Sequence, residues 1–139
     1  MNRNLSCIML VDDNPDDNFF HEREIKKDHL AATVVVKNSG IEALEYLKSK
    51  EDVTRLPPDL IFLDINMPGM NGWEFLEEYG MLDNKFQSDV LIIMLTTSDN
   101  PDDEERSRAW RNVTDYITKP LTKEKMKVIV DKFFKLPDH

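Results

Sequence analysis

Acidic, hydroxyl and ammonium side chains follow separate apolar runs of this 139-residue sequence. In chain order these groups are Asp12, Asp13, Asp64, Thr96 and Lys119. Clustered carboxylates repel one another unless a cation lies between them, and oxygen-only ligands suit a hard divalent ion such as Mg²⁺. Beside such an ion a carboxylate can attack a phosphoryl group, while an ammonium and a hydroxyl stabilise the phosphoryl oxygens. The residue types therefore predict metal-assisted phosphoryl transfer to a carboxylate.

The runs that precede these groups have the length and composition of buried strands. Four are rich in branched apolar residues and a fifth is weaker, and they cover residues 7–11, 33–36, 60–63, 90–95 and 115–118. Stretches with helical spacing separate them, and this alternation is typical of a parallel sheet covered on both faces. Ligands of such sheets bind at the carboxyl ends of the strands. The sequence therefore predicts that the polar groups meet at one edge of the sheet.

Capping residues mark the starts of the first two predicted helices. Asn14 is a good N-cap, and Pro15 suits the first helical position. Asp16 and Asp17 follow, where carboxylates suit the positive end of the helix dipole. Ser39 caps the next helix. The predicted apolar face of that second helix consists of Ile41, Leu44 and Leu47.

Three further helices are predicted in the second half of the chain. Residues 72–79 form a short helix, residues 101–110 form the helix before the last strand, and the last helix begins at Thr122. This last helix carries an apolar stripe at helical spacing. The stripe consists of Met126, Ile129, Val130 and Phe133.

Composition favours one globular domain and argues against several kinds of partner. The net charge of −9 makes nucleic acid a poor direct partner. No apolar run approaches the roughly 20 residues that span a bilayer, and no signal peptide is visible, so we expect no membrane partner. Cys7 is the only cysteine, and we expect it in the core of a cytoplasmic protein. The three histidines lack ligand spacing and are expected to be exposed to solvent: His21, His29 and His139.

We expect a single domain over residues 1–139, with a core over about residues 5–135 and no output domain. Charge is uneven within it. Residues 119–135 carry a local balance of +4, and the remainder carries −13. The last helix therefore presents a basic surface on an acidic protein.

Taken together, these residues resemble the receiver domains of bacterial response regulators, and among them the single-domain members similar to the chemotaxis regulator. The resemblance covers about residues 5–135. It depends on Asp12-Asp13, on Asp64-Ile65-Asn66-Met67-Pro68-Gly69 with Asn71-Gly72, on Leu95-Thr96-Thr97-Ser98, and on Tyr116-Ile117-Thr118-Lys119-Pro120. It implies a flavodoxin-like α/β fold: a doubly wound, five-stranded parallel sheet of (βα)5 topology, with helices on both faces and the strand order 2-1-3-4-5 known for this family's chemotaxis member.

The resemblance also implies a role for each residue of the site. Asp64 would be the phosphoacceptor, and Lys119 would contact the phosphoryl group. Asp13 and Asp64 would bind Mg²⁺ directly, with Mn²⁺ as a substitute. Asp12 would act mainly through water, and Asn66 would offer its backbone carbonyl to the metal.

Further roles come from the same resemblance. Thr96 would hydrogen-bond the phosphoryl group and form a switch pair with Tyr116. Pro120 would follow a cis peptide bond. The side chains of Asn66 and Ser98 occupy positions whose variation in the family is associated with the dephosphorylation rate.

The implied partners are proteins. A histidine kinase or a histidine phosphotransfer protein would donate the phosphoryl group from a phosphohistidine, and the domain would later hydrolyse its own aspartyl phosphate as a switch rather than an enzyme. The signal would leave through residues 101–110, the last strand and the last helix, to an unidentified downstream protein or to a second copy of the chain. Charge reversal would weaken this association at Lys123, Lys125 and Lys127.

Three other functions were weighed against this interpretation. A pseudo-receiver would bind partners without phosphorylation, although every chemical position is filled here. An aspartyl-nucleophile phosphatase would resemble a pattern with a second Asp two residues after the nucleophile, where Asn66 cannot supply a proton. A flavin-binding flavodoxin would need a phosphate-cradling loop after the first strand, where Asp12 and Asp13 would repel the phosphate.

Overall fold

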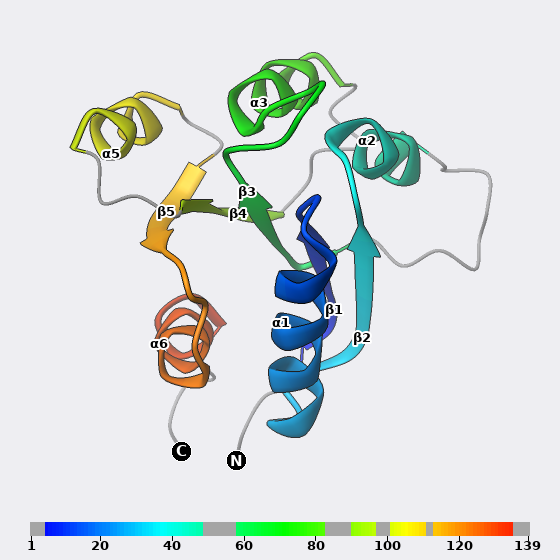
Figure 1. Cartoon of the computed structure of the whole chain (residues 1–139). Coiled ribbons are helices and arrows are strands. Elements are labelled where there is room, and N and C mark those ends of the chain that lie inside the picture. Colours follow the sequence, from blue (N-terminus) through cyan, green and yellow to red (C-terminus); the bar gives the residue numbers. More distant parts are fainter. Residues whose placement is uncertain (1–4, 49–57, 83–89, 97–100, 111–112, 135–139) are drawn as a thin grey trace.

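The structure is a computed structural model that describes residues 5–48, 58–82, 90–96, 101–110 and 113–134. Strands and helices alternate along these residues (Figure 1). In chain order they are β1 (Leu5–Val11), α1 (Pro15–Lys27), β2 (Ala31–Lys37), α2 (Gly40–Lys48), β3 (Leu60–Asp64), α3 (Gly72–Gly80), β4 (Leu91–Thr96), α5 (Pro101–Arg108), β5 (Val113–Thr118) and α6 (Lys123–Phe134). All five predicted strands are present, with ends that differ by one or two residues from the prediction. None of the described helices is long and apolar enough to cross a bilayer.

The five strands form one parallel sheet in the order β2-β1-β3-β4-β5. The predicted fold class and strand order are therefore confirmed. The chain runs outward from β1 to β2 and then returns to β3 on the other side of β1, so the winding direction reverses at this pair. Val11 lies opposite Leu63 across it. The residues that follow, Asp12 and Asp64, consequently leave the sheet side by side.

Helices cover both faces of the sheet (Figure 1). On one face α1 and α6 lie next to each other, and α2, α3 and α5 lie on the other face. Each face has its own apolar cluster. The predicted stripe of α6 is confirmed, because Met126, Ile129 and Val130 are buried and Phe133 packs partly buried against the same cluster. Cys7 is fully buried in β1, as expected.

The predicted helix caps are present as well. The Asn14 side chain accepts hydrogen bonds from the backbone N–H groups of Asp16 and Asp17, at 2.9 and 3.1 Å. The Ser39 hydroxyl accepts one from Glu42 N at 3.1 Å. The Thr122 hydroxyl accepts one from the first turn of α6.

The predicted apolar face of α2 is confirmed for Leu44 and Leu47, which are buried and partly buried in the core, but is wrong for Ile41. Ile41 of α2 is 55% exposed, whereas Ala43 and Leu44 are buried. The cause is the close approach of the α2 N-terminus to the loop after β3, where a Cβ on Gly40 would lie 2.8 Å from the Met70 sulfur. With Gly40 facing inward, the next residue lies about 100° further around the helix and points to solvent.

The helix α5 has almost no apolar surface. Residues 102–108 are charged apart from Ser107, which is the buried residue of the helix and donates its hydroxyl hydrogen to the Glu104 carbonyl. The Arg106 guanidinium lies over the Trp73 ring of α3, 4.5 Å from its centroid, and Arg108 pairs with Glu104. The pair of Arg108 and Glu104 lies within the helix. The contact of Arg106 with Trp73 therefore holds α5 against α3, together with Trp110 beyond its end, which packs partly buried against the core.

Gly72 marks the closest approach of α3 to the sheet. A Cβ there would lie 2.9 Å from the Asp64 carbonyl oxygen and 2.9 Å from the Ile65 Cα, and both are backbone atoms. We therefore expect Gly72→Ala to lower the free energy of unfolding by about 1–3 kcal/mol in urea titration, because α3 has to move outward. Glu77→Ala, on the exposed side of the same helix, should change it by less than about 0.5 kcal/mol. Equal losses in both variants would contradict this explanation.

Candidate functional site

Three carboxylates converge at the carboxyl edge of the sheet. Asp12 and Asp13 follow β1 and Asp64 ends β3, and one oxygen of each lies within 4.8 Å of the others. Asp12 and Asp64 are buried, while Asp13 is exposed. All the donors are oxygens, so the group has the chemistry of a Mg²⁺ or Mn²⁺ site.

Lys119 is the cation closest to this group within the described residues. Its Nζ lies 2.6 Å from Asp12 Oδ2, 2.9 Å from Asp17 Oδ2 and 3.5 Å from Asp64 Oδ1. Burial lowers the pKa of the Lys119 ammonium, but its hydrogen bonds to Asp12 and Asp17 raise that pKa by more. The net pKa lies above the ordinary value, so the side chain carries a full positive charge.

Asp64 is the least satisfied of the three carboxylates. Its Oδ1 is buried and has no hydrogen-bond partner among the residues that the structure describes. The pKa of Asp64 is raised from 3.8 to about 6, mainly by burial and next by the charge of Asp12, while Lys119 and a backbone hydrogen bond from Asn66 act in the opposite direction. A buried oxygen without a partner, next to other carboxylates, fits a position for a cation or a phosphoryl group.

Backbone contacts fix the loop that carries Lys119. The Lys119 N–H donates to the Thr96 carbonyl at 2.6 Å, which ties the end of β5 to the end of β4. The peptide bond between Lys119 and Pro120 is cis, as the resemblance implies. The Lys125 ammonium, from α6, donates to the carbonyls of Thr118 and Pro120 at 2.7 and 3.1 Å. Residues on either side of Lys119 are thus held from both β4 and α6.

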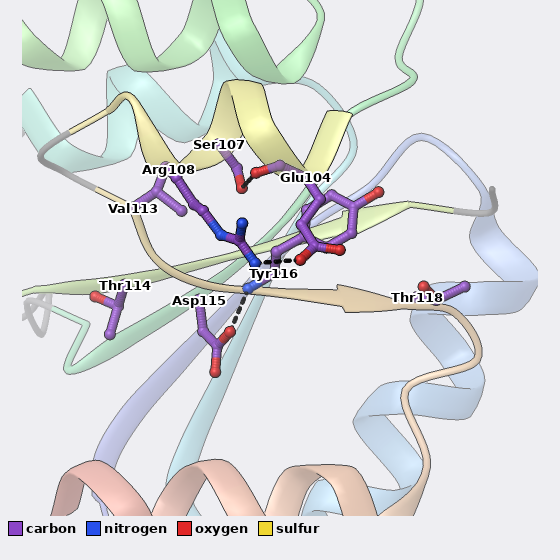
Figure 2. A pocket seen from close by; sticks show the side chains of 8 residues that line it. All are labelled: Glu104, Ser107, Arg108, Val113, Thr114, Asp115, Tyr116 and Thr118. Carbon is purple, nitrogen blue, oxygen red and sulfur yellow. Dashed lines mark hydrogen bonds and ion pairs between the residues drawn. The ribbon is translucent and has the colours of Figure 1, made fainter. Parts of the chain in front are cut away.

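The two predicted switch residues lie on neighbouring strands. Thr96 is fully buried at the end of β4, and Tyr116 is partly buried on β5. Figure 2 shows a pocket between α5 and β5, of about 310 Å³, in which the Tyr116 ring lies beside the Glu104 side chain. Thr96 thus lies on the strand next to β5, which lines a pocket on the α5 side of the sheet.

Of the other predicted residues, Asn66 is exposed directly after the strand that ends in Asp64. Ser98 lies outside the described residues. The expectation that all histidines are exposed is wrong for His21, which is 2% exposed on α1. Burial lowers the pKa of His21, while the charges of Asp17 and Lys119 act on it in opposite directions. The packing of α1 on the sheet therefore places a buried imidazole near Asp12 and Asp17.

Two contributors to the site were missed by reasoning from the sequence. Asp17 was assigned only to the helix dipole, yet it contacts Lys119 across 102 residues of chain. Lys125 was assigned to an outer basic surface, yet it braces the loop of Lys119. A long-range contact of this kind leaves no local signal, although the place of Asp17 in the first helical turn, four residues after Asp13, is compatible with a side chain that faces the same edge.

Comparison with known proteins agrees with the fold. The model of the response regulator receiver domain family matches residues 8–131. Response regulator Rcp1 of Synechocystis sp. is 30% identical over 113 residues, which cover 81% of this chain and 75% of that protein. Sensor histidine kinase CheAY of Helicobacter pylori is 31% identical over 129 residues, which cover 93% of this chain. The chain spans only 15% of the length of that kinase.

Solved structures show the same similarity. A two component response regulator from Cytophaga hutchinsonii has a TM-score of 0.84 and 28% identity, with 94% of this chain and 97% of that chain covered. The Mn(2+)-bound form of response regulator Rcp1 has a TM-score of 0.72 and 27% identity, with 93% and 94% covered.

The raised pKa of Asp64 predicts how the stability of the metal-free protein depends on pH. The folded protein binds the Asp64 proton more tightly than the unfolded chain, so this group's contribution is present below about pH 4 and is lost as pH rises through about 6. Asp64→Asn should therefore differ little from wild type at pH 4. At pH 7, in a chelating buffer, it should be more stable by about 1–3 kcal/mol. Urea titrations at both pH values test this, and a difference that does not grow with pH would refute it.

Proposed function

The chain belongs to the response regulator receiver domain family, and we propose that Asp64 is the residue on which it accepts a phosphoryl group. Receiver domains are the switch modules of two-component signal transduction. The observation that carries the assignment is the Asp64 carboxylate itself: buried, with an oxygen that lacks a hydrogen-bond partner among the described residues, and 3.5 Å from the Lys119 ammonium.

Asp12, Asp13 and Asp64 would hold Mg²⁺, or Mn²⁺ in its place, with the backbone carbonyl of Asn66. The fit is supported by three carboxylate oxygens within 4.8 Å of one another and by Asp64 Oδ1, which accepts no hydrogen bond among the described residues. It is supported as well by the likeness to Rcp1, whose solved form binds Mn(2+). When bound, the ion would neutralise the carboxylates and the phosphoryl oxygens.

The chain's own residues would carry out the transfer. An Asp64 oxygen attacks the phosphorus of a phosphohistidine on a histidine kinase or phosphotransfer protein. The P–O bond forms as the P–N bond breaks, and the bonding electrons leave on the imidazole nitrogen, which takes a proton from solvent. Lys119 donates to a phosphoryl oxygen, and Thr96 donates its hydroxyl hydrogen to another. Water later hydrolyses the aspartyl phosphate.

The signal would pass from Thr96 to Tyr116 and to the surface made by α5, β5 and α6. Phosphorylation would favour a second packing of this surface, because the contact between Thr96 and the phosphoryl group exists only in the phosphorylated state. The surface would then bind a downstream protein or a second copy of the chain, in the cytoplasm. Its α6 side is basic, and a second pocket there, between β5 and α6, exposes Val128. An acidic protein surface suits it better than nucleic acid.

The proposed acceptor can be tested with a small donor. Incubation with acetyl phosphate and Mg²⁺ should add one phosphoryl group, detected by intact-protein mass spectrometry. The added mass should be absent in Asp64→Asn and after chelation of the metal. Asp59→Asn serves as a control for the loss of a carboxylate, because Asp59 caps the start of β1 and lies at the opposite end of β3. Retained modification of Asp64→Asn would refute the assignment.

The proposed output surface makes a separate prediction. Thr96→Ala should still be phosphorylated but lose phosphorylation-dependent association. Among the three lysines expected at this surface, Lys123 pairs with Asp28 at 3.6 Å and Lys125 braces the loop of Lys119, so both have other roles. Lys127→Glu is therefore the suitable charge reversal, and we expect it to weaken association at least threefold with phosphorylation unchanged.

Its matched control is Lys48→Glu at the exposed end of α2, which packs on β2 at the opposite edge of the sheet from β5 and so changes the same charge away from the surface. Sedimentation or pull-down of the phosphorylated protein measures the association. Equal effects of the two reversals would show that total charge matters rather than this surface.

A further inference from the structure

A fourth carboxylate reaches the site from outside the proposed metal cluster. Asp17 lies in the first turn of α1, and its Oδ2 is 2.9 Å from the Lys119 ammonium. The Lys119 side chain is 9% exposed and that of Asp17 is 36% exposed. Asp17 does not belong to the group of three carboxylates that lie close enough together to share an ion. Its contact is with the cation of the site alone.

The hydrogen bonds of the Lys119 ammonium go to carboxylates other than Asp64. Nζ hydrogen-bonds Asp12 and Asp17 at 2.6 and 2.9 Å, but it lies 3.5 Å from Asp64 Oδ1. An ammonium has three N–H donors, so two of them are engaged by carboxylates. The separation from Asp64 is too long for a good hydrogen bond, and this oxygen has no other partner in the described part of the chain. The acceptor oxygen and the lysine therefore form an ion pair without a hydrogen bond between them.

The backbone of α1 holds Asp17 in place for this contact. The Asn14 side chain accepts from the backbone N–H of Asp17 at 3.1 Å, and Pro15 begins the helix. The Asn18 side chain, in the same turn, donates to the carbonyl of Asp12 at 2.8 Å. The first turn of α1 is thus fixed to the end of β1, so that Asp17 projects toward Lys119 from a rigid support.

We propose that Asp17 is a positioning residue that restrains Lys119 and slows the phosphorylation of Asp64. A phosphoryl group on Asp64 needs the ammonium as a donor, and Asp17 competes for it in the unphosphorylated protein. Asp17 also repels the incoming phosphoryl charge. Both effects lower the rate of phosphorylation of Asp64. The inference rests on the proposed phosphorylation of Asp64 and adds a residue that sets its rate.

Asp16 provides a matched control within the same turn. It is exposed, carries the same charge, lies one residue closer to the helix N-terminus and also has its backbone N–H capped by Asn14. The described contacts of Lys119 do not include it. If Asp17 acted only through the helix dipole or through net charge, Asp16→Asn and Asp17→Asn would behave alike.

The first experiment measures the rate constant of phosphorylation by acetyl phosphate at saturating Mg²⁺. Asp17→Asn should be phosphorylated about three- to tenfold faster than wild type, whereas Asp16→Asn should stay within about twofold. The affinity for Mg²⁺ should be the same in the two variants, because neither residue belongs to the carboxylate cluster. A slower Asp17→Asn, or equal rates in both variants, would overturn the proposal.

A second measurement asks whether Asp17 acts through Lys119. Asp17→Asn should lower the melting temperature of the unphosphorylated protein in the wild-type background, because an ion pair is lost. In a Lys119→Met background the decrease should be clearly smaller, since the ion pair is already absent and only the helix dipole and the repulsion between carboxylates remain. The same shift in both backgrounds would show that the two side chains are not coupled and would refute the mechanism.

The wild-type protein separates this inference from the function on which it rests. Failure of wild type to accept a phosphoryl group would refute the proposed function. Normal phosphorylation of wild type, together with equal rates for Asp16→Asn and Asp17→Asn, would refute the restraint alone.

Discussion

The balance between one buried ammonium and two buried carboxylates is the constraint on which the rest of the site depends. Asp12 and Asp64 leave adjacent strands side by side, and an unpaired charge at that depth would be costly. Lys119 offsets the cost only if its loop brings Nζ to the sheet edge. The backbone contact to Thr96, the turn at Pro120 and the brace from Lys125 all serve that placement. The balance is incomplete, and the residue left with a raised pKa is Asp64.

The sheet explains why these groups meet at all. Because the winding direction reverses between β1 and β3, two strands far apart in sequence end next to each other, with the first helix and the loop after β3 diverging to opposite faces. The approach of α3 then closes one side of the site, and Gly72 permits it. The same arrangement places β4 and β5 beyond β3. Thr96 at the end of β4 and Tyr116 on β5 therefore lie one and two strands away from Asp64, in the order of the strands.

Most of the fold was predictable from the sequence, because local patterns of residues mark where its strands and helices lie. Apolar runs gave the strands, Asn14 and Ser39 gave helix starts, and the resemblance implied the strand order. The burial of His21 and the exposure of Ile41 were not predictable, since each depends on which side of its helix meets the sheet. Within the site, residue types pointed to Asp12, Asp13, Asp64 and Lys119. The roles of Asp17 and Lys125 depend on contacts between distant segments, and no local pattern encodes them.

The composition of α5 has a consequence for how firmly this part of the molecule is seated. A helix that buries an apolar stripe has a large free energy of docking, which salt hardly changes. The contact of α5 with α3 instead relies on charge, because the Arg106 guanidinium lies over the Trp73 ring. Exposed contacts of this kind are weak and are screened over about 8 Å at physiological ionic strength. The free energy that docks α5 is therefore small and depends on salt. Little free energy is needed to shift this helix, which borders the pocket of Tyr116.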